Sequence, residues 1–473
     1  MPPVVDLCVI GAGAAGLTTA AVAAHLGART VLIERGRMGG ECLNTGCVPS
    51  KALLAAAKAA HEIGASRRFG IAAGEKAVDF AAVHRHVHGV IAAIAPHDSA
   101  ERFEGLGVEV IHAEVRFIGP REIMAGNRLV RARRIVIATG SEPAIPPIPG
   151  LDNVAYFTNE TIFEQDRLPA HLLIVGAGAV GIELAQAYRR LGAQVTVVEA
   201  AKALPRDDSE LAGMLVRRLA EEGVAILEEA TVEAAEPDGA GVVLTVAQQG
   251  ARRRLSGSHL LVAAGRRPRI AALDLDRAGV RHDEDGISVD RRQRTTARGV
   301  YAIGDVTGGP RLTHAAAYQA GIVIRNALFR LPARADYAAL PWVTYTDPEL
   351  AQIGLREEAA RQRYGADISV VRLPLTENDR AQAERDTGGL VKLVARRDGR
   401  ILGASLLAPH AGEMSHLWVL AIAQHLKLKD IAGLPLPYPT RGEAGKLAAA
   451  EFYKPRLFSP WVRRAVRALS WLP

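Results

Sequence analysis

Cysteine is scarce in this sequence, with three in 473 residues: Cys8, Cys42 and Cys47. So small a number excludes the disulfide-rich scaffolds of small secreted domains. A structural zinc site would need further ligands at familiar spacing around Cys42 and Cys47, and Cys8 lies inside a predicted strand. We therefore expect no structural metal.

Long apolar runs and targeting signals are also lacking. The mildly hydrophobic stretches near 7–24 and 172–187 are rich in glycine and alanine, which favours nucleotide-binding turns over membrane spans. Residues 1–6 contain no basic segment and lead directly into a strand pattern, so a cytoplasmic protein is expected. The net charge of +7 is spread along the chain without a zinc-finger or aromatic-basic motif, so no nucleic-acid partner is expected.

Two of the cysteines, Cys42 and Cys47, stand five positions apart before an Ala- and Leu-rich helical run. This spacing lets the sulfurs meet across roughly one helical turn. A disulfide closing so short a loop adds little stability, and idle disulfides are reduced in the cytoplasm. We therefore interpret the pair as a redox-active disulfide, the alternatives being buried thiols or half of a zinc site. If the helix begins near Cys42, its N-terminal dipole favours a thiolate.

A glycine motif follows the first predicted strand. The β-branched run 3–10 ends at Gly11, Gly13 and Gly16, a helix is predicted to about Leu26, and a second strand ends on Glu34. Glycines permit a tight turn beside a helix N-terminus, and the acid accepts hydrogen bonds from ribose hydroxyls. The complete strand, turn, helix, strand and acid predict a dinucleotide-binding unit.

The same construction recurs at Gly176, Gly178 and Gly181, followed by a helix and a strand that ends before Glu199. The acid follows the first glycine by 23 residues in both copies, so two dinucleotides are expected. Similar strands, 135–140 and 260–265, close the two units, and a further strand leads into Gly304 and Asp305. A proline-rich linker, 143–150, separates the copies. From about Pro341, strands with intervening helices predict a separate α+β domain.

Together these motifs resemble the FAD-dependent pyridine nucleotide-disulfide oxidoreductases, a family that includes lipoamide dehydrogenase, glutathione reductase and mercuric reductase. The resemblance extends over almost the whole chain. It implies an α/β protein with two Rossmann-like domains, for FAD and NAD, and an α+β C-terminal dimerisation domain. The expected boundaries are 1–149 with 268–338 for FAD, 150–267 for NAD(P), and 339–473 for the interface of a homodimer.

The resemblance also implies roles for individual residues. Cys47 would face the flavin, Cys42 would exchange with substrate, and Lys51 would pair with Glu183 beside the flavin. Asp305 would bind the ribityl chain. The residues expected around FAD are Gly11, Gly13, Gly16, Glu34, Arg35, Gly40, Glu41, Lys51, Ala113, Thr139, Gly140, Ser141, Gly304, Asp305, Leu312, Thr313 and His314. Those expected around the nicotinamide nucleotide are Gly176, Gly178, Gly181, Ile182, Glu183, Glu199 and Gly265.

Coenzyme choice follows from charge. Glu199 can accept hydrogen bonds from a free ribose 2′-hydroxyl but would repel a 2′-phosphate, and positions 199–201 contain no arginine. NADH is therefore expected in preference to NADPH, although Lys202 lies close by in the sequence.

One position departs from much of the family. Lipoamide dehydrogenases and glutathione reductases carry a His-Pro-Thr-x-x-Glu segment whose histidine is the acid/base, whereas this chain has Tyr438 followed by Pro-Thr-Arg-Gly-Glu443. A phenol of pKa about 10 is a weak base near neutral pH, so oxidation of dihydrolipoamide should be slow unless another group or water handles the proton. The expected catalytic residues are Cys42, Cys47, Lys51, Tyr438 and Glu443.

Mercuric reductases also have tyrosine at this position, so the acceptor could be a disulfide or a thiol-bound soft metal ion held transiently at Cys42 and Cys47. Against a full mercuric reductase, a terminal vicinal cysteine pair and a cysteine-bearing N-terminal module are absent. The interpretation is an NAD(P)H-dependent, mercuric-reductase-like enzyme; the alternatives are a dihydrolipoyl dehydrogenase and a catalytically weakened flavoprotein that acts as a scaffold.

The C-terminal segment 456–473 combines aromatic and basic residues. From Trp461, apolar residues fall on one helical face, and Arg463, Arg464 and Arg467 fall on the other. This pattern suggests peripheral contact with a membrane surface or a partner, the alternative being packing on its own domain.

Overall fold

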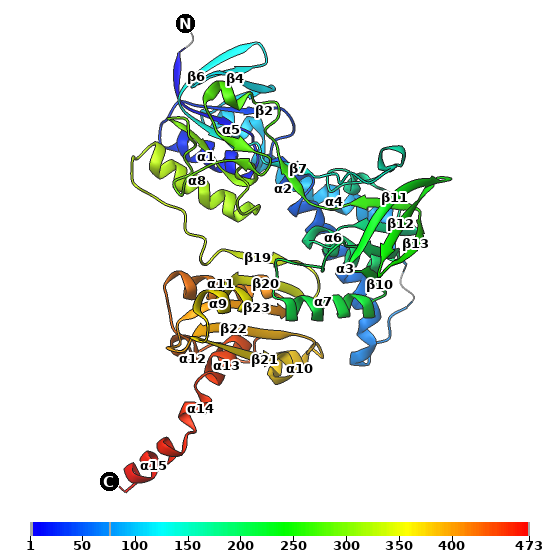
Figure 1. Cartoon of the computed structure of the whole chain (residues 1–473), viewed down its shortest axis with the longest axis vertical. Coiled ribbons are helices and arrows are strands. Elements are labelled where there is room, and N and C mark those ends of the chain that lie inside the picture. The colour runs from blue at the N-terminus through cyan, green and yellow to red at the C-terminus, as the bar shows by residue number, and fades with distance from the viewer. Residues whose placement is uncertain (1–2, 75–76, 472–473) are drawn as a thin grey trace. The chain divides into compact units, whose positions relative to one another are not determined.

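The computed structural model describes residues 3–74 and 77–471 and divides into two compact units. Unit 1 comprises 1–62, 75–200 and 227–336, and unit 2 comprises 63–74, 201–226 and 337–473. Each unit is built around its own sheets and helices (Figure 1).

The main sheet of unit 1 has the strand order β3-β2-β1-β6-β5-β4, and β18 pairs with the C-terminal end of β6. Strands β1, β2, β3, β6 and β18 run parallel, whereas β4 and β5 pair antiparallel. The strands are β1 (Val4–Ile10), β2 (Thr30–Glu34), β3 (Glu109–His112), β4 (Val115–Gly119), β5 (Glu122–Ala125), β6 (Arg128–Ile137) and β18 (Val300–Ala302).

Buried aliphatic side chains explain this sheet. Leu7, Cys8 and Val9 in β1 are fully buried, since a parallel strand covered on both faces reads as a continuous apolar run. One face packs against α1 (Ala14–His25) and α8 (Thr313–Ala327), which are rich in alanine and lie side by side (Figure 1). The predicted first strand, helix and second strand are therefore confirmed.

In a second sheet, the unit 1 strands β9, β8 and β14 are hydrogen-bonded neighbours that run parallel, and the second glycine turn follows β8. Helix α6 follows that turn. A three-stranded antiparallel sheet, β11-β12-β13, packs against it. The elements are β8 (His171–Val175), α6 (Ala179–Leu191), β9 (Gln194–Val198), β11 (Ala230–Asp238), β12 (Gly241–Gln248), β13 (Ala251–Gly257) and β14 (His259–Val262).

Shorter elements complete unit 1. Strand β7 pairs antiparallel with β15, and β16 pairs with β17. These strands and the remaining helices are α2 (Gly40–Asn44), α3 (Cys47–Ala65), α4 (Phe80–Ile94), η2 (Ala95–Asp98), α5 (Ala100–Gly105), β7 (Ser141–Pro143), η3 (Leu151–Asn153), η4 (Ile162–Glu164), β15 (Arg266–Pro268), η5 (Leu275–Ala278), β16 (His282–Asp283), β17 (Gly286–Ile287) and η6 (Gly304–Thr307). Strand β10 (Val224–Leu227) spans a boundary, with 224–226 in unit 2 and Leu227 in unit 1.

Unit 2 is an antiparallel sheet of order β19-β20-β23-β22-β21 with α11 and α13 packed against it (Figure 1). This is the predicted α+β domain. Its elements are η1 (Ser66–Phe69), α7 (Ser209–Glu221), β19 (Pro341–Thr344), β20 (Glu349–Gly354), α9 (Glu357–Tyr364), β21 (Ile368–Pro374), η7 (Leu375–Glu377), α10 (Asp379–Ala383), β22 (Leu390–Arg396), β23 (Ile401–Ala408), α11 (Ala411–Ala423), α12 (Leu428–Ala432), α13 (Glu443–Glu451), α14 (Lys454–Leu457) and α15 (Pro460–Leu469).

A buried charge cluster lies in unit 2. The Lys392 side chain is 2% exposed, and its Nζ lies 2.8 Å from Asp208, 3.0 Å from Glu210 and 2.9 Å from Glu357. Arg372 also pairs with Glu210 and Glu357. Three carboxylates around one buried ammonium satisfy its three donors, which is the condition for keeping a charge in a core.

Candidate active site with two dinucleotide turns

The first glycine turn has no room for a side chain at Gly11 or Gly16. Gly11 has φ +103°, and a Cβ at Gly16 would lie 1.8 Å from the Gly11 carbonyl oxygen. The Ala12 amide donates to Glu34 Oε2 at 2.6 Å, which fixes the acid at the end of β2 beside the turn. This cradle at the N-terminus of α1 fits a dinucleotide pyrophosphate and ribose.

The second turn repeats this geometry. Gly176 has φ +108°, and a Cβ at Gly181 would lie 2.0 Å from the Gly176 carbonyl oxygen. The Ala177 amide donates to Glu199 Oε2 at 2.7 Å. The structure therefore contains two equivalent cradles, each built from a strand, a turn and a helix.

The segment before the cysteines lies against the first turn. Gly39 donates its amide to the Ala12 carbonyl at 2.9 Å, and a Cβ at Gly40 would lie 2.6 Å from Gly13 Cα. Both Gly39 and Gly40 have positive φ. Glycine is needed here because the backbones approach too closely for a side chain.

The two cysteines lie on different helices, which corrects one expectation. The long helix begins at Cys47, the first residue of α3, whereas Cys42 is the middle residue of the short helix α2. The break occurs because Thr45 leaves helical geometry, with φ −144° and ψ 10°. The N-terminal dipole of the long helix therefore acts on Cys47 rather than Cys42.

Both cysteines are free thiols in this structure, which describes the reduced pair. The hydrogen bond from Cys42, with one from Thr313 and the charge of Lys51, lowers the pKa of Cys47 to about 6 against the opposing effect of burial. The same hydrogen bond, together with burial, raises the pKa of the Cys42 thiol. At neutral pH the pair therefore holds one proton, on Cys42, and one thiolate, on Cys47.

Two further contacts surround Cys47. Its Sγ lies 3.4 Å from Oγ1 of Thr313, the first residue of α8. One turn further along α3, Lys51 Nζ lies 2.8 Å from Glu183 Oε2, so the pair expected from the resemblance is present. Glu183, in α6, is 4% exposed, and Lys51 forms an ion pair with it.

A polar network that the sequence did not reveal is centred on Arg266. Its guanidinium pairs with Glu41 and donates to Ser141 Oγ at 2.8 Å, and Ser141 donates to Asp305 Oδ2 at 2.6 Å. Asn159 donates to Glu41 Oε1 at 3.0 Å. Burial raises the pKa of Glu41 to about 7, although Arg266 opposes the shift. The network brings together three residues expected at FAD: Glu41, Ser141 and Asp305.

The comparison with family models decides the family. Residues 5–320 match the model described as pyridine nucleotide-disulphide oxidoreductase, and residues 340–449 match the dimerisation domain of the same family. This chain belongs to the pyridine nucleotide-disulphide oxidoreductases. The family binds FAD and uses a pyridine nucleotide, and the dimerisation domain supports a homodimer.

Three relatives illustrate the range within the family. A mercuric reductase of Streptomyces lividans is 39% identical over 94% of this chain and 96% of its own. A dihydrolipoyl dehydrogenase of Geobacillus stearothermophilus is 34% identical over 94% and 95%, respectively. The Cu(II) complex of the HOCl-induced flavoprotein disulfide reductase RclA from Escherichia coli has a TM-score of 0.86 at 29% identity, covering 95% of this chain and 100% of that one.

Other residues expected at the cofactors of this oxidoreductase lie at strand ends and turns. Ala113 donates its amide to the Glu34 carbonyl at 3.0 Å, Thr139 Oγ1 donates to the Arg269 carbonyl at 2.8 Å, and the Gly304 amide donates to Gln319 at 2.6 Å. Of the remaining residues, Arg35, Thr313 and His314 are exposed, Leu312 is half-buried and Ile182 is buried. Gly140 and Gly265 have positive φ.

Tyr438 and Glu443 lie in unit 2 of this family member. The Tyr438 side chain is exposed, and its hydroxyl donates to Asp379 Oδ2 at 2.8 Å. That hydrogen bond raises the pKa of Tyr438, which keeps the phenol protonated at neutral pH. Glu443 begins α13, and its carboxylate accepts a long hydrogen bond, 3.4 Å, from the Thr440 amide.

Across the described ranges 3–74 and 77–471, no helix combines the length and the apolar character needed to cross a membrane.

Proposed function

We propose that this oxidoreductase uses NADH to reduce a thiol-bound soft metal ion such as Hg(II), or a disulfide, through Cys42 and Cys47. The observation that carries the proposal is the placement of Cys47 at the start of α3, 3.4 Å from Thr313 Oγ1 and one turn before Lys51, with Cys42 as its hydrogen-bond partner; these groups lower the pKa of Cys47. FAD, when bound, supplies a two-electron carrier between the nicotinamide and the sulfurs.

The glycine cradles and their acids hold the two dinucleotides. Gly11, Gly16 and Glu34 surround the expected FAD site, and the pair of Lys51 and Glu183 lies beside Cys47. Ser141 and Asp305 provide hydrogen-bonding groups for a polar cofactor chain. The predicted boundaries assign Glu183 to the NAD domain, 150–267, and the other groups to the FAD domain, 1–149 with 268–338; the predicted interface domain is 339–473.

The sulfur chemistry balances over one cycle. NADH and one proton reduce the Cys42–Cys47 disulfide to the dithiol and release NAD⁺. With a disulfide acceptor, Cys42 loses its proton and attacks one sulfur, one thiol leaves, and Cys47 then attacks Cys42, so that the second thiol leaves and the enzyme disulfide re-forms. With Hg(II), the two sulfurs displace its thiol ligands, and NADH supplies the two electrons that give Hg(0).

The favoured acceptor is the metal ion because of Tyr438. A protonated phenol with a raised pKa cannot accept the proton of a dithiol as an imidazole can. In the proposed homodimer, Tyr438 and Glu443 of the partner subunit complete the acceptor site. The mercuric reductase of S. lividans is 39% identical to this chain, and the dihydrolipoyl dehydrogenase of G. stearothermophilus is 34% identical. This difference also favours the metal ion over a lipoyl disulfide as the acceptor.

NADH is the proposed electron donor. The Glu199 carboxylate lies at the second turn, where the Ala177 amide holds it at 2.7 Å. A ribose 2′-hydroxyl can donate to this carboxylate, whereas a 2′-phosphate would be repelled by it.

The deciding experiment is steady-state NADH oxidation by the FAD-loaded enzyme with thiol-complexed Hg(II) and with lipoamide in parallel. Preferential turnover of Hg(II), lost in Cys42→Ser, supports the proposal. Efficient turnover of lipoamide would instead support the alternative function, a dihydrolipoyl dehydrogenase. Absence of turnover with either acceptor, in protein that retains FAD, supports the scaffold alternative.

We further propose that α15 contacts an anionic lipid surface. Trp461, Val466 and Leu469 are exposed on this helix, none of its residues is buried, and Arg463, Arg464 and Arg467 supply positive charge. Leu472, which the sequence pattern also placed on the apolar face, lies outside the described residues. Sedimentation with phosphatidylcholine–phosphatidylserine vesicles tests the proposal: deletion of 456–473 should abolish binding, and binding that survives the deletion would contradict it.

A further inference from the structure

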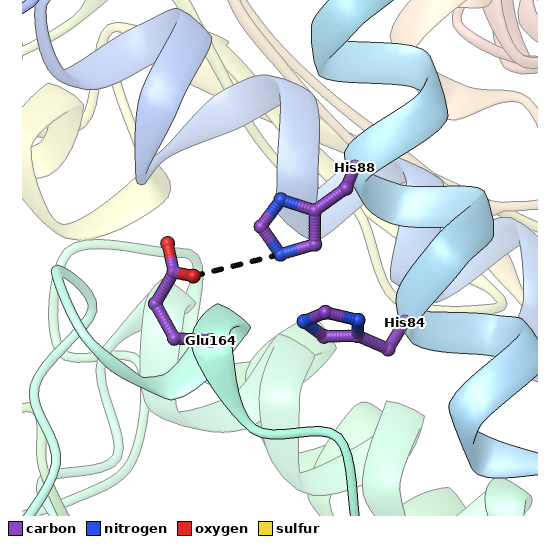
Figure 2. Close-up of side chains that lie close together, drawn as sticks. All are labelled: His84, His88 and Glu164. Carbon is purple, nitrogen blue, oxygen red and sulfur yellow. Dashed lines mark ion pairs between the residues drawn. The ribbon is translucent and has the colours of Figure 1, made fainter.

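Three possible metal ligands meet away from the cysteines. His84 and His88 lie one turn apart on α4, and Glu164 is the last residue of η4. Their ligand atoms all lie within 4.8 Å of one another. Figure 2 shows both imidazole rings and the carboxylate pointing toward one small space. None of the three was singled out from the sequence, although two histidines at i and i+4 share a helix face.

Packing holds the two segments in place. Ile162 and Phe163 of η4 are buried, and the Tyr188 hydroxyl donates to the Ile162 carbonyl at 3.4 Å. The Tyr188 ring also lies 5.9 Å from that of Phe80, which begins α4. Glu164 therefore projects from a segment that is anchored to the same helix as the histidines, and the approach of the three side chains does not depend on a freely moving loop.

The polar groups of this cluster are incompletely satisfied. Nε2 of His84 is buried and has no hydrogen-bond partner among the described residues. His88 Nε2 lies 3.1 Å from the Phe163 carbonyl oxygen and 3.8 Å from Glu164 Oε2. The centroids of the two rings lie 4.2 Å apart, and the ring planes are tilted by 48° to each other. A buried imidazole nitrogen without a partner is costly, and a metal ion bound to its lone pair would remove that cost.

We propose that His84, His88 and Glu164 bind a divalent transition-metal ion of the Zn²⁺ type. Two imidazoles and one carboxylate form a tetrahedral ligand set with water in the fourth position. Ligands about 2.0–2.2 Å from such an ion lie roughly 3.3–3.6 Å apart. The ligand atoms of the cluster lie within 4.8 Å of one another, so binding needs side-chain rotations, in which His88 Nε2 exchanges its hydrogen bond with the Phe163 carbonyl for the ion. Glu164 is 55% exposed, which gives the ion and its water access from solvent.

The site would fasten α4 to η4. This assignment is independent of the proposed electron acceptor, because no member of the cluster belongs to the cysteine pair or to either glycine turn. A metal ion that binds the folded protein and not the unfolded chain stabilises the folded state by RT ln(1 + [L]/Kd), so the melting temperature rises with the concentration of free ion. The expected effect is therefore on stability rather than on NADH turnover.

The test uses FAD-loaded, full-length protein in which Cys42 and Cys47 are both serine, so that soft-metal binding by the thiols does not contribute. After treatment with a chelator, Zn²⁺ is titrated against a chromophoric zinc chelator, and melting is followed with and without Zn²⁺. We expect one tight site and a higher melting temperature. His84→Ala should weaken binding by about tenfold or more and abolish the stabilisation.

Two controls distinguish this site from others. His86 lies on the same helix but is exposed and outside the cluster, so His86→Ala should bind Zn²⁺ like the parent protein. Glu349, His410 and Glu413 form a second group with ligand atoms within 4.8 Å, and His410→Ala should also leave the tight site intact. Retention of tight binding in His84→Ala, or its loss in His86→Ala or His410→Ala, would overturn the proposal. FAD content and circular dichroism verify that each variant is folded.

Discussion

The Lys51 ammonium lies 2.8 Å from the Glu183 carboxylate, which joins two residues 132 positions apart in the chain. Lys51 is also one of the charges that lower the pKa of Cys47. Lys51→Met should therefore raise that pKa from about 6 and slow iodoacetamide alkylation of the reduced enzyme at pH 7 by roughly two- to tenfold. Lys58→Met, on the same helix, is the control. An unchanged pH midpoint of alkylation would show that Lys51 does not act on Cys47.

The two sulfurs should have different spectroscopic signatures. Because Cys47 is the thiolate and Cys42 retains the proton, long-wavelength thiolate-to-flavin absorbance in the NADH-reduced, FAD-loaded enzyme should disappear in Cys47→Ser. In Cys42→Ser, which cannot form the disulfide, the band should be present with oxidised flavin before any NADH is added. Survival of the band in Cys47→Ser would reverse the assignment of the two sulfurs.

Glu41 is a candidate for the proton-handling role that histidine has in related enzymes. Burial raises its pKa to about 7, so the carboxyl carries a proton below that pH and loses it above. Glu41→Gln should remove an inflection near pH 7 from the profile of kcat/KM and lower its maximum roughly tenfold or more. Glu104→Gln, an exposed acid on α5, is the control. An unchanged profile with normal FAD content would exclude the role.

Tyr438 should limit activity with lipoamide. Its pKa is raised by the hydrogen bond to Asp379, so it is a poor base. Tyr438→His should increase lipoamide turnover by on the order of a hundredfold, because imidazole titrates near neutral pH. Tyr438→Phe separates this gain from mere loss of the phenol. If histidine gives no gain beyond that of phenylalanine, the residue does not control proton transfer.

The buried cluster around Lys392 predicts a pH-dependent stability. Burial alone would raise the pKa of Glu357, but hydrogen bonds from Lys392 and Arg361 lower it to about 2. The stabilisation is therefore fully present above about pH 4.5 and is lost as the pH falls toward 2. Glu357→Gln should cost roughly 1–3 kcal/mol at pH 7, with a smaller cost at pH 4.

The neighbouring Glu358 offers a matched control for this measurement because it is exposed. Thermal unfolding of Glu358→Gln should follow the parent protein across the same pH range. A deficit in Glu357→Gln that stays constant from pH 7 to pH 4 would mean that Glu357 has no depressed pKa.

Local patterns predicted the parts of the fold that local chemistry determines. The run from Val4 to Glu34 contains its own strand, glycine turn, helix and acid, and all four occur where expected. Strand β20 has no continuous apolar pattern, because the buried Gln352, which accepts a hydrogen bond from Ser405, interrupts it. Strand β13 cannot be predicted from its largely polar Ala251–Gly257 sequence, because its position depends on pairing with β12.

In the candidate site, too, some residues could be predicted from local sequence, whereas others meet only through distant contacts. The sequence identified Cys42, Cys47 and Lys51 because they share one motif, yet the start of α3 was misplaced because Thr45 breaks the helix. Arg266 meets Glu41 across 225 residues of chain, and no spacing rule connects them. Such contacts exist only once the sheet has brought distant strand ends together.

The buried position of Cys8 has a practical consequence. This residue is 0% exposed in β1, and burial raises the pKa of its thiol to about 12. Thiol reagents applied to the folded dithiol form should therefore label two of the three cysteines. The third can react only after the main sheet of unit 1 opens. The number of labelled cysteines per chain therefore measures unfolding of unit 1 without an engineered probe or a fluorescence signal.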